Sequence, residues 1–183
     1  FEQIGERLLE TGRNFLSEHD SAEPALVLFG RPYNAFTRDA NMGIPRKFTS
    51  QGVTVIPFDM IFEDDAEIPP NNYWYYGQQN MKAVTQVKNV ENLYLSWISN
   101  FSCAPDSFML HYIRWMMGEK PYLILEIDSH TADAGLDTRI EAFLDIVESY
   151  RRQAVQSADL QPQLEWGVAF DGEDSQARNP RTG

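Results

Sequence analysis

Cys103 is the one cysteine of the chain, and it stands between an apolar segment and a segment with helical periodicity. We expect the N-cap of that helix at Asp106 or Ser107, which would leave Cys103 just ahead of the first turn. Free amide groups and the positive end of the helix dipole favour a thiolate there, the form that binds a metal or attacks an electrophile. The alternative is a small buried cysteine without chemistry. Since the chain has no second cysteine, a metal at Cys103 would need ligands from elsewhere.

Two other polar segments follow apolar ones and are candidates for ligand binding. Residues 30–34, Gly-Arg-Pro-Tyr-Asn, lack the repeated glycines of a phosphate loop, so Arg31 either contacts an anion or belongs to a rigid turn. Asp128 and His130 resemble a carboxylate–histidine pair, but no nucleophile at a defined spacing completes it. Most such pairs are solvated or structural. A self-contained enzyme built on these two residues is therefore the least favoured hypothesis.

Four consecutive aromatic residues, from Tyr73 to Tyr76, are the third unusual feature. Their rings could stack on a ligand, pack in the core, or form an interface whose partner is a neighbouring domain. The pattern favours the core or the interface over the ligand.

Apolar segments typical of buried strands alternate with segments of helical periodicity, which indicates right-handed crossovers and a parallel sheet. We predict an α/β fold with a doubly wound, mostly parallel four-stranded sheet, strand order 2-1-3-4, and helices on both faces. In that order the winding reverses between the first and third strands, and ligands bind outside the carboxyl ends of strands at such a point. The expected strands are 25–29, 53–58, 93–98 and 122–127. The expected helices are 2–18, 38–51 with an interruption at Pro45, 73–92, 107–117 and 138–154, the last opened by a capping box of Thr138 and Glu141.

The composition narrows the classes of partner. The chain has 183 residues, a net charge of −12 and a pI near 4.6, which argues against nucleic acid and anionic membrane surfaces. No apolar stretch approaches the roughly 20 residues of a membrane span, and no basic region with an apolar run opens the chain. A single cysteine agrees with a reducing compartment. We therefore predict a cytoplasmic protein.

The pattern also suggests how the chain is divided. We expect an N-terminal amphipathic helix within residues 1–22, a doubly wound α/β domain at 23–156 and an irregular tail at 157–183. Because the chain lacks an initiator Met and its periodicity ends after Leu164, we interpret it as an excised module of a larger protein.

Several phrases, taken together, resemble the module behind the ATPase domains of large activators of 2-hydroxyacyl-CoA dehydratases, the CoA-substrate-specific enzyme activase family. That module is similar to iron–sulfur dehydratase subunits and to double-cubane cluster proteins. The resemblance covers residues 24–150. The phrases are GRPYN at 30–34, YWYYGQ at 73–78, SCAPDSF at 102–108, and EIDSHTADAG at 126–135 followed by RIEAF at 139–143.

The resemblance implies a low-potential iron–sulfur protein of the 4Fe-4S kind from an anaerobic or facultative bacterium, in which ATP hydrolysis by a partner domain drives one-electron transfer. Cys103 would be a cluster ligand, with Arg31, Tyr33 and Asp106 in contact with the cofactor. The partners would be the missing domains of the same polypeptide, ATPase domains included, and an acyl-CoA dehydratase; a homodimer is compatible with the family.

The other cluster cysteines and the ATPase signatures are absent from these residues. We therefore expect the isolated chain to hold no stable cluster and to hydrolyse no ATP, while the full-length protein would be an ATP-dependent activase or reductase of acyl-CoA dehydratases. The alternative is a noncatalytic docking domain that joins ATPase domains to a partner, with Cys103 merely buried.

Overall fold

The computed structural model describes residues 2–19, 23–62, 65–68, 71–100, 104–128 and 130–164, without the side chains of residues 2 and 157–164. The chain divides into two compact units, Phe1–Arg151 and Arg152–Gly183. The first unit contains the sheet and the helices packed on it. Of the second unit, the structure describes the helical residues 152–164.

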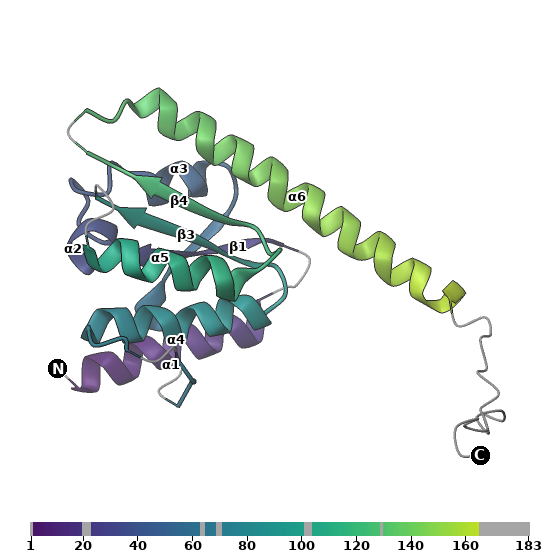
Figure 1. Cartoon of the computed structure of the whole chain (residues 1–183), viewed down its shortest axis with the longest axis horizontal. Helices are drawn as coiled ribbons and strands as arrows, with labels where there is room; N and C mark the ends of the chain where they lie inside the picture. The colour runs from purple at the N-terminus through teal and green to yellow at the C-terminus, as the bar shows by residue number, and fades with distance from the viewer. Residues whose placement is uncertain are drawn as a thin grey trace, which may run out of the picture. The chain divides into compact units, whose positions relative to one another are not determined.

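The first unit is built on a four-stranded parallel sheet with the order β2-β1-β3-β4 (Figure 1). This confirms the predicted fold class and strand order. The two central strands are buried along their whole length, as expected for apolar segments covered on both faces. The register pairs Ala25 with Thr54 and with Leu93, and Leu95 with Tyr122. The strands are β1 (Ala25–Gly30), β2 (Thr54–Pro57), β3 (Leu93–Ser99) and β4 (Tyr122–Glu126).

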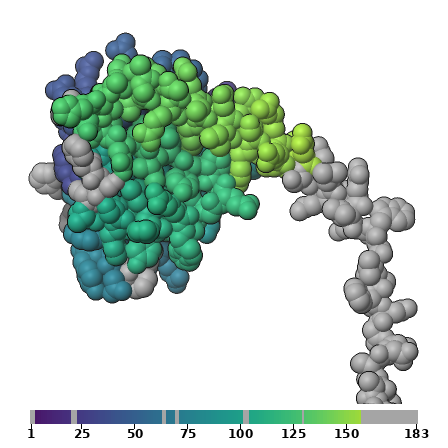
Figure 2. All heavy atoms as spheres, turned by 45° about the horizontal axis from the view of Figure 1, so that its top comes forward, coloured from purple at the N-terminus to yellow at the C-terminus, as the bar shows by residue number. Residues whose placement is uncertain are grey.

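Helices cover both faces of this sheet. In Figure 1, α1, α4 and α5 lie on one side, and α3 and the amino-terminal part of α6 lie on the other. The space-filling view in Figure 2 shows the part of α6 in the first unit as a continuous green surface on the face turned to the viewer. The helices are α1 (Glu2–Glu18), α2 (Pro32–Ala35), α3 (Ile44–Ser50), the 3-10 turn η1 (Phe58–Met60), α4 (Tyr75–Asn89), α5 (Ala104–Met117) and α6 (Asp133–Leu164).

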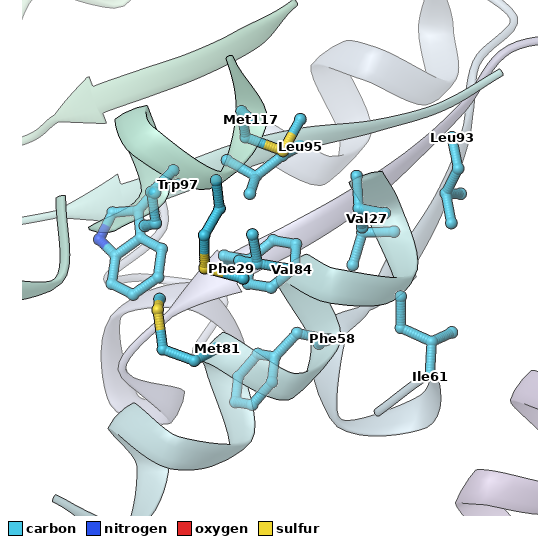
Figure 3. Close-up of a cluster of buried hydrophobic side chains, with 14 of the residues drawn as sticks. Val27, Phe29, Phe58, Ile61, Met81, Val84, Leu93, Leu95, Trp97 and Met117 are labelled. Carbon is cyan, nitrogen blue, oxygen red and sulfur yellow. The ribbon is translucent and has the colours of Figure 1, made fainter. Parts of the chain in front are cut away.

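Alternate side chains of the central strands enter two separate hydrophobic clusters. Val27, Phe29 and Trp97 belong to the cluster that packs on α4 and α5, shown in Figure 3. The rings of Phe29 and Trp97 stack with their centroids 6.1 Å apart. Leu26 and Leu28 face the opposite cluster, with buried side chains of α3 and α6. The period of two along each strand thus places Trp97 on the α4 and α5 side.

The predicted N-terminal helix is confirmed as α1, which lies against η1 through an unusually close backbone approach. A Cβ atom added at Gly12 would overlap the carbonyl oxygen of Met60. Glycine therefore allows the helix to sit directly on this turn.

Three predicted helix boundaries are wrong. The helix expected at 38–51, with an interruption at Pro45, is shortened to α3, which begins at Ile44 because Pro45 fits only the first turn of a helix. The N-cap expected at Asp106 or Ser107 is wrong because α5 begins at Ala104, with Pro105 in its first turn.

The start of α6 also differs from the prediction. The helix begins at Asp133, and the Thr138 hydroxyl donates a hydrogen bond to the Ala134 carbonyl inside it, 3.1 Å away, rather than capping an end. The helix also continues beyond the predicted end, to Leu164. Among the residues that the structure describes, no helix has the length and apolar character needed to span a membrane.

Candidate functional site at the carboxyl ends of β1 and β3

An ion pair joins two of the predicted site residues. Nε of Arg31, the first residue after β1, lies 3.3 Å from Oδ1 of Asp106 in the first turn of α5. Asp106 is 1% exposed, so its carboxylate sits in a low-dielectric setting where an opposite charge matters most. Sequence reasoning named both residues as cofactor contacts, and the structure brings them together.

The carboxylate of Asp106 has a second partner in the last residue of β3. The hydroxyl of Ser99 donates a hydrogen bond to Oδ2 of Asp106 over 2.7 Å, and Ser99 is fully buried. Asp106 therefore connects the carboxyl ends of both central strands to α5. This is the point where the winding of the sheet reverses, as the strand order predicts.

The backbone at the end of β1 depends on Gly30. Its φ of 136° lies in a region that side chains rarely adopt, and an added Cβ would lie 2.5 Å from the carbonyl oxygen of Ile98. The Gly30 amide donates to Oδ1 of Asn80 on α4 over 3.3 Å, and the Asn80 amide group donates to the Tyr76 carbonyl over 2.6 Å. These bonds connect α4 to the strand that carries Arg31.

Tyr33 extends the pair toward solvent. The centre of the Arg31 guanidinium lies 4.8 Å from the centroid of the Tyr33 ring, within the range of a cation–π interaction. Tyr33 is 54% exposed, so its ring forms an outer face rather than a buried wall.

A cavity of about 220 Å³ opens beside the ion pair, between α4, α5 and the end of β3. Its walls are mostly aromatic or apolar. The indole N–H of Trp97 is buried and has no hydrogen-bond partner within the described part of the chain, and the same holds for Nε of Arg31. The lining residues are Arg31, Trp74, Tyr75, Tyr76, Gly77, Asn80, Trp97, Pro105, Asp106 and Met109.

The aromatic segment from Tyr73 to Tyr76 lies at the rim of this cavity and at the start of α4. Tyr73 is 80% exposed, Tyr75 67% and Tyr76 49%, so the interpretation of these rings as core is wrong. Trp74 is anchored by an edge contact with Phe108, with the ring centroids 5.4 Å apart. A ligand contact and an interface are the two interpretations that remain.

Cys103 lies outside the described residues, so its predicted roles as a metal ligand and as a cofactor contact stay predictions. The residue that follows it in sequence, Ala104, opens the 14-residue helix α5. Within the described residues, no group of three or more His, Cys, Asp or Glu side chains is placed to hold a metal ion. These residues therefore do not by themselves fit an iron–sulfur cluster, whose further ligands would have to come from beyond this sequence.

Asp128 and His130 form a loop motif. Oδ1 of Asp128 accepts hydrogen bonds from the backbone amide of His130, at 2.7 Å, and from the hydroxyl of Thr131, at 2.9 Å. These bonds, that from Thr131 foremost, lower the pKa of Asp128. The carboxylate bonds the backbone of His130, which is the arrangement of an Asx turn and serves the loop conformation.

Trp97, Ser99 and Asn80 are site residues that sequence reasoning missed. Trp97 belongs to the apolar run 93–98, which was interpreted only as a strand, and Ser99 lies one residue beyond the predicted end of that strand. Asn80 lies in the middle of α4 and is 2% exposed. The sequence signal that could have identified Asn80 was an amide side chain in the middle of an amphipathic helix. If such an amide is buried, it needs hydrogen-bond partners, and this points to a polar site.

The first third of the chain matches a known family. Residues 1–61 match the model of the CoA enzyme activase uncharacterised domain (DUF2229). Within residues 24–61, where the match and the predicted resemblance overlap, this confirms the predicted relationship to the CoA-substrate-specific enzyme activases, including the phrase at Gly30–Asn34. The chain matches no curated protein and no solved structure.

Proposed function

We propose that this chain, whose residues 1–61 match a CoA enzyme activase domain, is a module of a 2-hydroxyacyl-CoA dehydratase activator in which Cys103 supplies one iron–sulfur ligand. The cluster would serve low-potential electron transfer driven by ATP hydrolysis in other domains of the polypeptide. The observation that carries the proposal is the start of α5 at Ala104, directly after Cys103 in sequence and beside the ion pair of Arg31 with the buried Asp106.

The electrostatics at this helix end support a negatively charged centre. The amide groups and dipole of α5 favour negative charge at its amino terminus. Asp106 already places one carboxylate there, but Arg31 balances its charge. The positive end of the α5 dipole can therefore stabilise a further negative charge, such as a thiolate or a metal–sulfide cluster.

The proposed cluster needs other ligands, because the chain has one cysteine. These ligands and the ATPase domains belong to the same full-length polypeptide, and the electron acceptor is an acyl-CoA dehydratase. Arg31, Tyr33 and Asp106 line the side of the module that faces the cofactor. The chain alone holds no stable cluster in this proposal and has no activity of its own.

Anaerobic reconstitution of the full-length protein with iron and sulfide tests the proposal. The Cys103→Ser variant should bind less iron and lose visible absorption, whereas the neighbouring Ser102→Ala variant should match the natural protein. Equal iron content and identical visible spectra in the Cys103→Ser variant would remove Cys103 from the ligand set.

A docking module is the second candidate, and the exposed aromatic segment favours it. Tyr73 and Tyr75 expose most of their surface, which is unusual for neighbouring aromatic residues on a protein without a partner. Here Cys103 is only buried, so a thiol reagent labels it after denaturation and not in the folded protein. If the docking hypothesis is right, replacing Tyr73 and Tyr75 with Ser should weaken binding to the dehydratase, while Cys103→Ser should leave that binding unchanged.

Thiol labelling separates the two candidate functions. Rapid labelling of Cys103 in the folded protein at neutral pH would argue against docking as the sole role.

A further inference from the structure

We propose that the outer side of α5, together with the aromatic residues at the start of α4, docks an amphipathic helix of a partner protein whose polar side is acidic. The inference rests on the docking candidate above and adds the chemistry of the partner, and it requires neither Cys103 nor a metal. Its evidence is a stripe of aromatic side chains along α5, an exposed tryptophan in that stripe, and a local excess of cations on an acidic protein.

The aromatic stripe runs along α5. Phe108, Tyr112 and Trp115 are spaced by four and then three residues, which places them on one side of a helix. The ring centroids of Phe108 and Tyr112 lie 5.0 Å apart, and Phe108 also makes the edge contact with Trp74 just ahead of α4. Trp115, one turn further along, is 76% exposed. The stripe thus connects the exposed aromatic segment before α4 to an exposed tryptophan near the end of α5.

A stripe of this kind suits a partner helix. Side chains at such spacing form a ridge, and a second helix packs with its own side chains in the grooves beside that ridge. In Figure 1, α4 and α5 lie side by side on the same side of the sheet, so the stripe and the start of α4 form one surface. Trp115 supplies the kind of side chain that most often dominates the binding energy of a protein interface.

The charges of this layer differ from those of the whole chain. The chain has a net charge of −12, but α4 and α5 together carry three Lys or Arg residues and one carboxylate. That carboxylate, Asp106, is buried and paired with Arg31, so it is not presented to a partner. Arg114 is exposed and precedes Trp115 directly, whereas Glu119 lies beyond the end of the helix. The outer side of α5 therefore offers a cation beside its aromatic anchor.

These local charges favour an acidic protein over other anionic partners. At physiological ionic strength, exposed charges more than about 8 Å apart are largely screened, so acidic residues on other faces have little effect here. Carboxylates of a partner helix would pair with Arg114 while its apolar side chains pack on Trp115. Recognition of anionic lipid takes clusters of about four to eight Lys or Arg residues, more than α4 and α5 carry. Nucleic acid is disfavoured by the net charge of the chain.

Two model peptides of about 20 residues, long enough to form a helix alone, test the inference. Both carry leucine on one side of the helix, and the polar side carries glutamate in one and lysine in the other. The measurement is the nitrogen–proton spectrum of the 183-residue chain, in which Trp115→Phe and Trp97→Phe assign two indole signals. We expect the glutamate peptide to shift the Trp115 signal in a saturable manner and the lysine peptide to shift it less. The signal of Trp97, which is 2% exposed, should stay in place.

Two pairs of variants separate this surface from the rest of the molecule. Arg114→Glu should weaken binding of the glutamate peptide about fivefold. Arg46→Glu changes the net charge equally but lies exposed on α3, on the other side of the sheet, so it should have little effect. Trp115→Ala should weaken binding about tenfold or more. Its matched control is Ile146→Ala, since Ile146 is 57% exposed on α6, and that variant should bind like the natural protein.

Three results would overturn the inference. Equal shifts of the Trp115 signal by the two peptides, or equal losses for Arg114→Glu and Arg46→Glu, would remove acidity from the description of the partner. A Trp115 signal that the glutamate peptide leaves in place would show that no such helix docks here. A larger response of this signal to vesicles containing phosphatidylserine than to the glutamate peptide would assign the surface to a membrane.

The full-length protein separates this inference from the proposed function. Cys103→Ser should leave binding of the glutamate peptide unchanged, whether or not Cys103 binds a cluster. If Trp115→Ala weakens peptide binding but not dehydratase binding, the dehydratase is not the partner and the docking surface stands. If replacing Tyr73 and Tyr75 weakens dehydratase binding while the glutamate peptide does not bind at all, this inference is wrong and the docking candidate stands.

Discussion

Nε of Arg31 and Oδ1 of Asp106 lie 3.3 Å apart and join the end of β1 to the first turn of α5. Arg31 retains 26% of its side-chain exposure while Asp106 retains 2%. Removing the cation would leave a buried carboxylate without its opposite charge, although the Ser99 hydroxyl would still donate a hydrogen bond to it. We predict that Arg31→Met lowers the free energy of unfolding by about 2–4 kcal/mol, measured by urea denaturation.

A double-mutant cycle isolates this interaction. Asp106→Asn in the Arg31→Met background should cost less than in the natural protein, because there it removes a buried carboxylate that has already lost its counter-charge. Arg46→Met is the matched control, since Arg46 lies exposed on α3, and it should change stability by no more than about 0.5 kcal/mol. Additive effects of the two site substitutions would show that the pair contributes no coupling energy.

Two glycines of α1 should respond to alanine in opposite directions. At Gly12 the new methyl group would overlap the Met60 carbonyl oxygen, so α1 must move away from η1. At Gly5 nothing lies within 4 Å, and alanine is the better helix former. Urea denaturation should show a loss of about 2 kcal/mol or more for Gly12→Ala. A gain of about 0.5–1 kcal/mol is expected for Gly5→Ala. Similar values for both variants would contradict the close packing of α1 on η1.

The fold was predictable because the two central strands are buried on both faces. Such strands are mostly apolar, so β1 stands out as a continuous apolar run and β3 as an apolar run with a buried serine, Ser96, inside it. Strand order could not be read from the pattern itself; 2-1-3-4 was predicted as the commoner short order of doubly wound sheets, and the structure has this order. The start of α5 was not predictable in the same way, because the polar side chain of Asp106, which suggested an N-cap, is used in a tertiary contact.

The candidate site was predictable in its location and in part of its membership. Arg31 and Asp106 follow separate strands, and the parallel sheet brings such positions to one edge. The ion pair between Arg31 and Asp106 depends on side-chain conformations, which the spacing of the two residues in the sequence does not predict. Trp97 was missed because an aromatic residue within an apolar strand is indistinguishable from ordinary core. Its unpaired N–H becomes visible only when the surrounding atoms are placed.

The loop after β4 offers a direct test of a lowered pKa. The Asp128 carboxylate accepts bonds from the Thr131 hydroxyl and the His130 amide, which lower its pKa from the ordinary 3.8. A depressed carboxyl pKa stabilises the loop above the ordinary pKa, and this stabilisation is lost as the pH falls through the lowered value. The His130 amide signal should therefore titrate with a midpoint below 3.8, followed by NMR. Asp128→Asn should abolish this titration; a midpoint at or above 3.8 would contradict the hydrogen bonds.

Lys120 should make the stability of the protein depend on pH. Its ammonium group donates to the carbonyl oxygens of Val87 and Val90 at the end of α4, each at 2.6 Å. Burial lowers the pKa of Lys120 to about 8, and the nearby Glu91 opposes part of that shift. Between pH 8 and 10.5 the unfolded chain binds more protons at this lysine than the folded chain, so raising the pH favours folding.

The Lys120→Met variant separates this effect from the other titrations of the chain. It removes two donors to helix-end carbonyls and should lower the free energy of unfolding by about 1–3 kcal/mol near pH 7. The difference from the natural protein should widen between pH 8 and 9.5, measured by urea denaturation. Tyr94, whose pKa burial raises to about 12, makes higher pH unsuitable, because its ionisation favours the unfolded chain. Lys88→Met, at an exposed position of α4, should show no such widening. A difference that stays constant or narrows over this range would contradict the lowered pKa of Lys120.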